Sequence, residues 1–117
     1  MRNFKELKIW QKGIDIAVKT YQFTDTFPKE DKYAIVHQMT RASVSISSNI
    51  AEGSSRKSEK DYSRFIELSI GSTFELETQI LIAEKLNKGN QQLLQELKVE
   101  VKDEQKMLTG FQQKLNP

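Results

Sequence analysis

The residues able to perform acid–base or metal chemistry are few in this chain of 117 residues. His37 is the only histidine and cysteine is absent, which excludes thiolate chemistry, disulfides and cysteine-ligated metals. A di-iron site of the bundle type needs a Glu-x-x-His spacing, but the residue three positions before His37 is Ala34. Glu75 and Glu77 are two positions apart, so on a helix their carboxylates point to different sides. We therefore expect no catalytic site, no cofactor and no metal, and a protein that is not an enzyme.

Cationic residues are the next candidates, and most of them lie in the first half of the chain. Residues 1–64 hold 12 Lys and Arg against 8 Asp and Glu, whereas residues 65–117 hold 6 against 8. Arginine binds phosphate in a bidentate manner, which makes these residues candidate contacts to nucleic acid. The predicted contacts are Lys8, Lys12, Arg41, Arg56, Lys57, Lys60 and Arg64. The alternative is an ordinary solvated face, which the net charge of +2 and the nearby Glu59 and Asp61 favour.

A row of short polar side chains runs through residues 38–52. At about 100° per residue its members fall within roughly a third of a helix circumference. They are Gln38, Arg41, Ser45, Ser48, Asn49 and Glu52, and we call them the polar stripe. Surface faces usually consist of Lys and Glu, so this composition favours close contact. We predict a structural assembly role for Arg41, Asn49 and Glu52, in which they pack subunits together or hold helix ends, with local ion pairs as the alternative.

Four helical segments must position these residues, at about 7–26, 29–52, 58–87 and 91–115. Apolar residues recur every three or four positions in each, and Pro28 ends the first. Gly53 follows the second segment, while Ser58 and Asn90 are candidate N-caps of the last two. Short connections favour antiparallel neighbours. The predicted fold is all-α, an antiparallel up-down-up-down four-helix bundle formed by residues 1–117 as one domain.

Two segments carry more apolar surface than the core of one small bundle requires. On the first, a triplet recurs every seven residues on the side opposite Trp10, Ile14 and Tyr21. This triplet is Ile9, Ile16 and Phe23. Apolar residues also cover well over half of the third segment. A helix that is apolar on two faces is usually buried on both, so the triplet predicts an oligomer interface. The alternative is scattered surface hydrophobic residues, which are common.

Targeting signals are not recognisable in the sequence. The first residues contain no apolar signal-peptide core, and no run approaches the ~18 apolar residues of a membrane span. We expect a cytoplasmic protein without membrane attachment.

The segment 38–56 also carries a family resemblance. Its motifs include Arg41-Ala42, Ser45-Ile46, Asn49-Ile50-Ala51-Glu52-Gly53 and Arg56. Together with Phe4–Lys12, Phe27-Pro28-Lys29-Glu30, Phe65 and Gly71-Ser72 before Glu75 and Glu77, they resemble the bacterial four-helix-bundle family of intervening-sequence proteins. These proteins are encoded within inserts of large-subunit ribosomal RNA genes and are often labelled ribosomal-protein-like. A relative of the family is the accessory protein of diversity-generating retroelements.

The resemblance implies a four-helix subunit that assembles into a closed ring, typically a homopentamer. The retroelement relative uses a basic surface to engage reverse transcriptase and nucleic acid, which implies a partner of this kind. Two functions remain open at this point. The first is a non-enzymatic oligomer that associates with RNA or DNA, and the second is a protein-interaction scaffold without nucleic-acid binding.

Overall fold

The structure is a computed structural model that describes residues 2–115. Its helical elements, in chain order, are η1 (Phe4–Glu6), α1 (Lys8–Thr24), η2 (Lys29–Asp31), α2 (Ile35–Ser54), α3 (Glu59–Lys85) and α4 (Gln91–Leu115). No strand occurs among residues 2–115. No helix in this part of the chain is long and apolar enough to cross a membrane.

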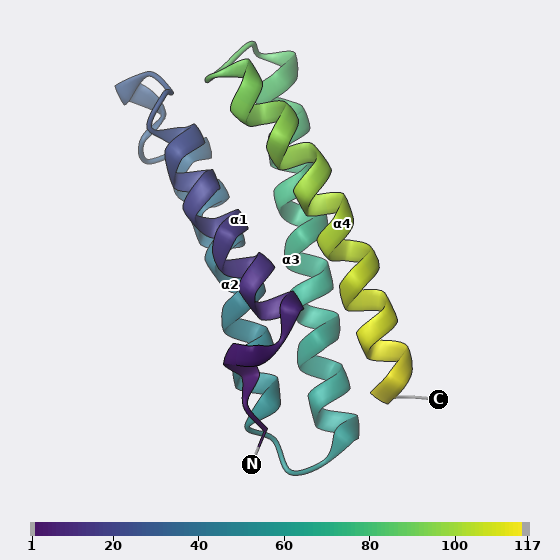
Figure 1. The fold of residues 1–117 in the computed structure, drawn as a ribbon. Coiled ribbons are helices and arrows are strands. Elements are labelled where there is room, and N and C mark those ends of the chain that lie inside the picture. Colours follow the sequence, from purple (N-terminus) through teal and green to yellow (C-terminus); the bar gives the residue numbers. More distant parts are fainter. Residues whose placement is uncertain (1, 116–117) are drawn as a thin grey trace.

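The four long helices run antiparallel to their neighbours along the chain (Figure 1). α1 packs against α2 and α4, and α3 packs against the same two helices from the other side. The start of α1, the α2–α3 connection and the end of α4 lie at one end, which we call the 2–3 end (Figure 1). The α1–α2 and α3–α4 connections form the opposite end, the 3–4 end. The predicted all-α four-helix bundle is confirmed.

Two predicted helix starts are confirmed by their capping bonds. The backbone N–H of Asp61 donates to Ser58 Oγ at 3.1 Å. The backbone N–H of Leu93 donates to Asn90 Oδ1 at 3.0 Å. Each side chain thereby satisfies one of the backbone donors left free in the first turn of a helix.

The predicted second segment, 29–52, is not continuous. Residues Lys29–Asp31 form the short helix η2, and Ala34 has the non-helical angles φ −117° and ψ −108° before α2 begins. Asp31 accepts an ion-pair contact from Lys88 Nζ at 2.6 Å, which fastens η2 to the α3–α4 connection. This contact joins residues that are far apart in the sequence. The local sequence around residues 29–34 therefore did not predict the break between η2 and α2.

Gly53 lies inside the last turn of α2, so the prediction that it follows the helix is wrong, and its φ angle is not positive. A Cβ at this position would lie only 2.7 Å from the Phe65 Cβ on α3. Gly53 therefore permits close approach of α2 and α3. The positive φ angles occur instead in the α3–α4 connection, at Asn87 (55°) and Gly89 (79°).

The core lies between all four helices, and it corrects the predicted oligomer interface. Ile9, Ile16 and Phe23 are only 4%, 0% and 0% exposed, so these three side chains are core residues of the subunit. On the face expected to be buried, Ile14, Val18 and Tyr21 are 37–53% exposed, whereas Trp10 is partly buried and packs against the core. Both faces of α1 are apolar at helical spacing, and periodicity alone did not distinguish them. Buried Gly13 and Thr20 complete the inner stripe and let α1 approach its neighbours.

Candidate nucleic-acid and assembly surfaces

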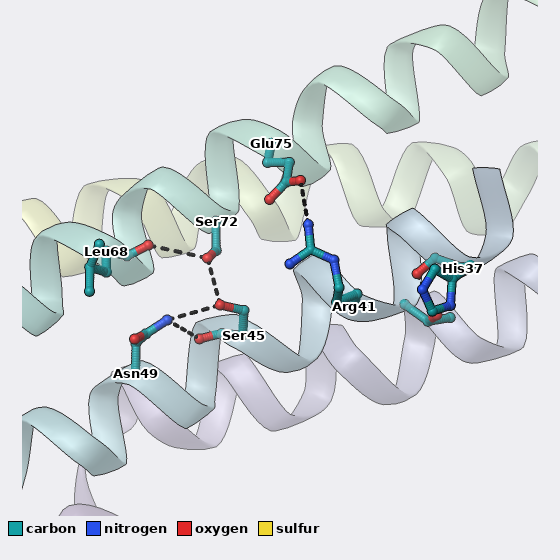
Figure 2. Close-up of polar contacts among 8 residues, drawn as sticks. His37, Arg41, Ser45, Asn49, Leu68, Ser72 and Glu75 are labelled. Atoms are coloured by element: carbon teal, nitrogen blue, oxygen red, sulfur yellow. Dashed lines mark hydrogen bonds and ion pairs between the residues drawn. The ribbon is translucent and has the colours of Figure 1, made fainter. Parts of the chain in front are cut away.

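The middle of the polar stripe joins α2 to α3. Asn49 Nδ2 donates to both the carbonyl oxygen and the Oγ of Ser45, each at 2.9 Å. The Ser72 hydroxyl on α3 lies 2.9 Å from Ser45 Oγ and 3.2 Å from the Leu68 carbonyl oxygen, and it donates to either (Figure 2). These groups are partly buried, so each satisfied donor avoids a desolvation cost of about 1–3 kcal/mol.

The ends of the polar stripe form ion pairs. Arg41 Nη2 lies 3.1 Å from Glu75 Oε2 on α3 (Figure 2). Glu52 pairs with Arg56 four residues later, at 3.0 Å. Gln38 and Ser48 are exposed. Arg41, Ser45 and Asn49 therefore contribute to contacts between or within α2 and α3, and Glu52 forms a local ion pair, while an assembly role of the stripe stays a prediction.

His37, the residue first considered for chemistry, is exposed near the start of α2. It lines a hollow of about 400 Å³ at the 3–4 end together with Tyr21 and Tyr33. Within residues 2–115, no group of three or more His, Asp or Glu side chains is placed to hold a metal ion.

The α2–α3 connection gathers four of the predicted cations at the 2–3 end. Lys57, Lys60 and Arg64 are exposed, and none of them forms an ion pair with another described residue. Arg56 is held in place more firmly: besides its pair with Glu52, its guanidinium carbon lies 4.6 Å from the ring centroid of Phe65. Three exposed, unpaired cations thus lie near one guanidinium that is held by other side chains.

Arg2 belongs to this cluster although sequence reasoning missed it. Its Nη1 donates to the carbonyl oxygens of Ser54 and Arg56, which are end groups of α2 and of the connection. Its guanidinium carbon also lies 4.7 Å from the Tyr62 ring centroid. Carbonyl groups at a helix end need donors, and a cation is favoured there by the helix dipole. The sequence indicated that the carbonyl groups at the end of α2 need a donor, but it did not indicate that Arg2 is that donor.

Arg2 and Arg56 face a shared hollow. It has a volume of about 700 Å³ and is open to solvent. Its lining consists of Arg2, Phe4, Ala51, Ser54, Ser55, Arg56 and Lys57. Three cations on one concave surface attract an anion more strongly than the same charges on a flat face, because the low-dielectric walls focus the field.

The other predicted contacts lie elsewhere. Lys8 lines a second hollow, of about 290 Å³, between α1 and α4 with Lys106 and Lys114. Lys12 lies close enough to the buried Glu104 to influence its pKa. Arg41 lies thirteen residues before the end of α2 at Ser54, roughly 20 Å along the helix axis at 1.5 Å per residue. Of the seven predicted residues, four therefore form one cluster, Lys8 lines a groove, Lys12 lies near Glu104 and Arg41 forms a distant ion pair.

The lysines that form ion pairs lie mainly towards the 3–4 end of the bundle. Towards the 3–4 end, Lys19 pairs with Glu96 and Glu100, each at 3.0 Å. Lys88 and Lys98 are likewise paired, with Asp31 and Glu84. Hydrogen bonds from Lys98 and then Gln95 hold the pKa of the Glu84 carboxyl below its usual range. At the 2–3 end, by contrast, Lys5, Lys8, Lys57, Lys60 and Arg64 form no ion pair with the described residues. Unpaired cations also occur at the 3–4 end, where Lys29, Lys32 and Lys85 form no ion pair with the described residues, but the 2–3 end holds more of them.

Two outer faces remain apolar. On α1 the exposed residues are Ile14, Val18 and Tyr21, which we call the α1 outer face. The α3 outer face comprises Leu68, Phe74, Leu81, Ile82 and Leu86, all between 41% and 57% exposed. Because α1 and α3 each pack against α2 and α4, they occupy diagonal positions, and their outer faces point to opposite sides of the bundle.

Comparison with known proteins agrees with the fold and the motifs. A family model described as 23S rRNA-intervening sequence protein matches residues 5–110. A similar solved structure is a 1.70 Å crystal structure of a protein with unknown function from the S23 ribosomal protein family of Bacteroides thetaiotaomicron VPI-5482. The two share 17% sequence identity with a TM-score of 0.78, over 88% of this chain and 96% of that one. No curated protein matches the chain.

Proposed function

This chain belongs to the 23S rRNA-intervening sequence protein family, and we propose that it is a non-enzymatic homo-oligomer whose 2–3 end associates with RNA or DNA. The observation that carries the proposal is the cluster of unpaired cations at the 2–3 end. Lys57, Lys60 and Arg64 have no acidic partner among the described residues, whereas Lys19, Lys88 and Lys98 towards the 3–4 end are each paired with a carboxylate. Free cations release counterions from a phosphate backbone, which is the main source of sequence-independent affinity.

The hollow beside this cluster supports contact with phosphate groups. Arg2 and Arg56 are held by backbone carbonyls, a carboxylate and aromatic rings, so little further side-chain entropy is lost when an anion binds. Their position favours contact with phosphate groups over recognition of bases. Neither arginine lies on a helix that protrudes from the bundle and could enter a groove of a nucleic-acid duplex. The proposed binding is therefore insensitive to sequence and strongly dependent on salt.

Assembly supports the same proposal. The α1 and α3 outer faces lie on opposite sides of the bundle, and an isologous dimer formed through one of them leaves the other exposed. Head-to-tail pairing of an α1 face with the next subunit's α3 face covers both, and it closes into a ring when the rotation permits. The homopentamer implied by the family resemblance is one such ring. Every added subunit repeats the basic 2–3 end and raises the avidity for a polyanion.

A protein-interaction scaffold is the second candidate. The apolar outer faces favour it, since exposed patches of Leu, Ile and Phe also mark sites for protein partners. In that case a protein from the native cell occupies the α3 outer face in fixed stoichiometry. For both candidates we propose that the protein acts in the cytoplasm. RNA, DNA and protein partners are all present there.

Fluorescence anisotropy with four labelled probes tests the proposal. Single- and double-stranded RNA and DNA of one length are titrated with the full chain at about 50 mM salt, and again at about 200 mM. We expect at least one probe to bind at the lower salt and to lose affinity steeply at the higher. Failure of all four probes at low salt overturns the nucleic-acid proposal. A stable complex with one cellular protein, isolated after nuclease treatment, then supports the scaffold.

A further inference from the structure

The core of the bundle contains an acidic side chain that neither its packing nor the proposed function explains. Glu104 on α4 is 0% exposed. Neither of its carboxyl oxygens has a hydrogen-bond partner among the described residues. Buried carboxylates are normally paired or hydrogen-bonded, because an isolated charge in the interior carries a large desolvation cost. Without a partner, the Glu104 carboxyl group is accommodated in the folded state most readily in its uncharged form.

The residues identified beside the Glu104 carboxyl on α1 and α2 are small. A Cβ at Gly13 on α1 would lie 3.4 Å from Glu104 Oε2 and 3.2 Å from Ser47 Cβ on α2. Gly13 thus leaves room for the carboxyl group against the backbone of α1. The hydroxyl of Ser47 points to the Val44 carbonyl oxygen of its own helix, at 3.5 Å.

Charged groups around Glu104 are few. Lys12 on α1 is the only charged residue in the described part of the chain with a resolved electrostatic effect on it, and none on α2 or α3 contributes one. On α4 itself, Glu100 precedes it by one turn and is paired with Lys19. No cation approaches Glu104 within ion-pair distance in this part of the chain.

We propose that Glu104 is a proton-operated switch: its uncharged form packs in the core, and its ionised form loosens α4 from α1. On ionisation the carboxylate gains from approaching Lys12 and water at the α1–α4 boundary. That movement requires α4 to shift against Gly13, which lies in the same contact. The groove that Lys8 and Lys106 line is formed by the same two helices, so the shift also alters that surface.

The direction of the pH dependence follows from burial. Desolvation raises the pKa of the Glu104 carboxyl to about 8, and the charge of Lys12 opposes this only in part. In the unfolded chain a glutamate titrates near pH 4.3. Between these values the folded state binds the proton and the unfolded state does not. The stabilisation is complete below the unfolded pKa and is lost as the pH rises towards about 8.

Two measurements on the full chain test the switch. The first is the ¹³C chemical shift of the Glu104 carboxyl carbon, followed by NMR from about pH 4 to 9.5. We expect titration more than two pH units above the ordinary glutamate value of about 4.3, and a further upward shift in Lys12→Met. Titration near pH 4.3 overturns the proposal, as does an unchanged midpoint in Lys12→Met. This measurement does not require the Glu104 variant to fold.

The second is urea unfolding of the wild type and of Glu104→Gln, at equal protein concentration across the same pH range. The amide is uncharged at every pH, so the variant lacks the titration of residue 104. All other titrating groups are the same in the two proteins, so their effects on stability cancel when the two are compared. We expect the folding equilibrium constant of the wild type to fall relative to the variant by about tenfold per pH unit between pH 5.5 and 7.5. Parallel pH dependence of the two proteins contradicts the switch.

Discussion

Arg41 Nη2 on α2 lies 3.1 Å from Glu75 Oε2 on α3, so the one arginine inside the polar stripe is committed to a contact between helices. The Arg41 side chain is 62% exposed and that of Glu75 is 42% exposed, which limits the pair to about 0–1 kcal/mol of stability. Arg41 is also remote from the cations of the 2–3 end.

Nucleic-acid affinity should therefore depend on Arg64 but not on Arg41. We expect Arg41→Ala to leave the dissociation constant for single-stranded RNA within about twofold of wild type. Arg64→Ala removes a cation from the cluster and should weaken binding several-fold at low salt. Anisotropy titrations under identical conditions compare the two. A larger loss in Arg41→Ala would show that the polar stripe itself binds the nucleic acid.

Asn49 should matter for stability because its amide joins two atoms of Ser45. Asn49→Ala removes two hydrogen bonds from a partly buried site, so we expect a loss of about 1–2 kcal/mol. Urea unfolding measures the loss, and subunit assembly is followed in parallel by light scattering. Ser48→Ala, an exposed change in the same stripe, is the control and should lie within about 0.5 kcal/mol of wild type. Unchanged melting and size in Asn49→Ala would contradict the structural role of the stripe.

Gly53 should not tolerate a methyl group. In Gly53→Ala the added Cβ would lie 2.7 Å from Phe65 Cβ and 3.1 Å from Tyr62 Cδ1, so α2 and α3 must move apart. Overpacking of this kind costs about 1–3 kcal/mol. The matched control is Gly110→Ala on α4, where no atom lies within 4 Å of the new Cβ. Helix propensity predicts that this control stabilises the protein by about 0.5–1 kcal/mol. Equal melting temperatures of the two variants would argue against close helix contact at Gly53.

Assembly should depend on the α3 outer face. Phe74 is 55% exposed in the isolated subunit, and Phe74→Glu places a charge in the proposed contact between copies. We expect light scattering to report a smaller particle, approaching the 13.5 kDa monomer. Val99→Glu on α4 changes an equally open apolar residue outside both outer faces and should leave the size unaltered. A monomeric wild type at micromolar concentration would contradict the assembly proposal directly.

The sequence predicted the four helices and two of their caps because apolar spacing, Ser58 and Asn90 act locally. It did not predict which side of α1 faces the core. Ile9, Ile16 and Phe23 form one apolar row and Ile14, Val18 and Tyr21 form another, and only packing against α2 and α4 decides between them. The break before α2 was missed because its anchor, the pair between Asp31 and Lys88, joins residues distant in sequence.

Only part of the candidate site was predicted, because only part of it consists of residues that are close in sequence. Lys57, Lys60 and Arg64 follow one another along the chain, so their proximity could be inferred. Arg2 reaches the cluster across more than fifty residues, through carbonyl groups exposed only where α2 ends. Glu104 was not recognised as buried, although it lies three residues after Val101 and four before Leu108 and so continues the apolar stripe of α4.

The salt dependence of single-stranded RNA binding tests the central claim most directly. The wild type is compared with the variant Lys57→Gln, Lys60→Gln and Arg64→Gln, and with a control of equal net charge, Lys29→Gln, Lys32→Gln and Lys85→Gln at the 3–4 end. If the 2–3 end neutralises phosphates, the slope of log affinity against log salt should shrink by about 2 in the first variant, at roughly 0.7 per contact. The control should keep the wild-type slope. Equal slopes in all three proteins, or the same reduction in both variants, would contradict a nucleic-acid surface at the 2–3 end.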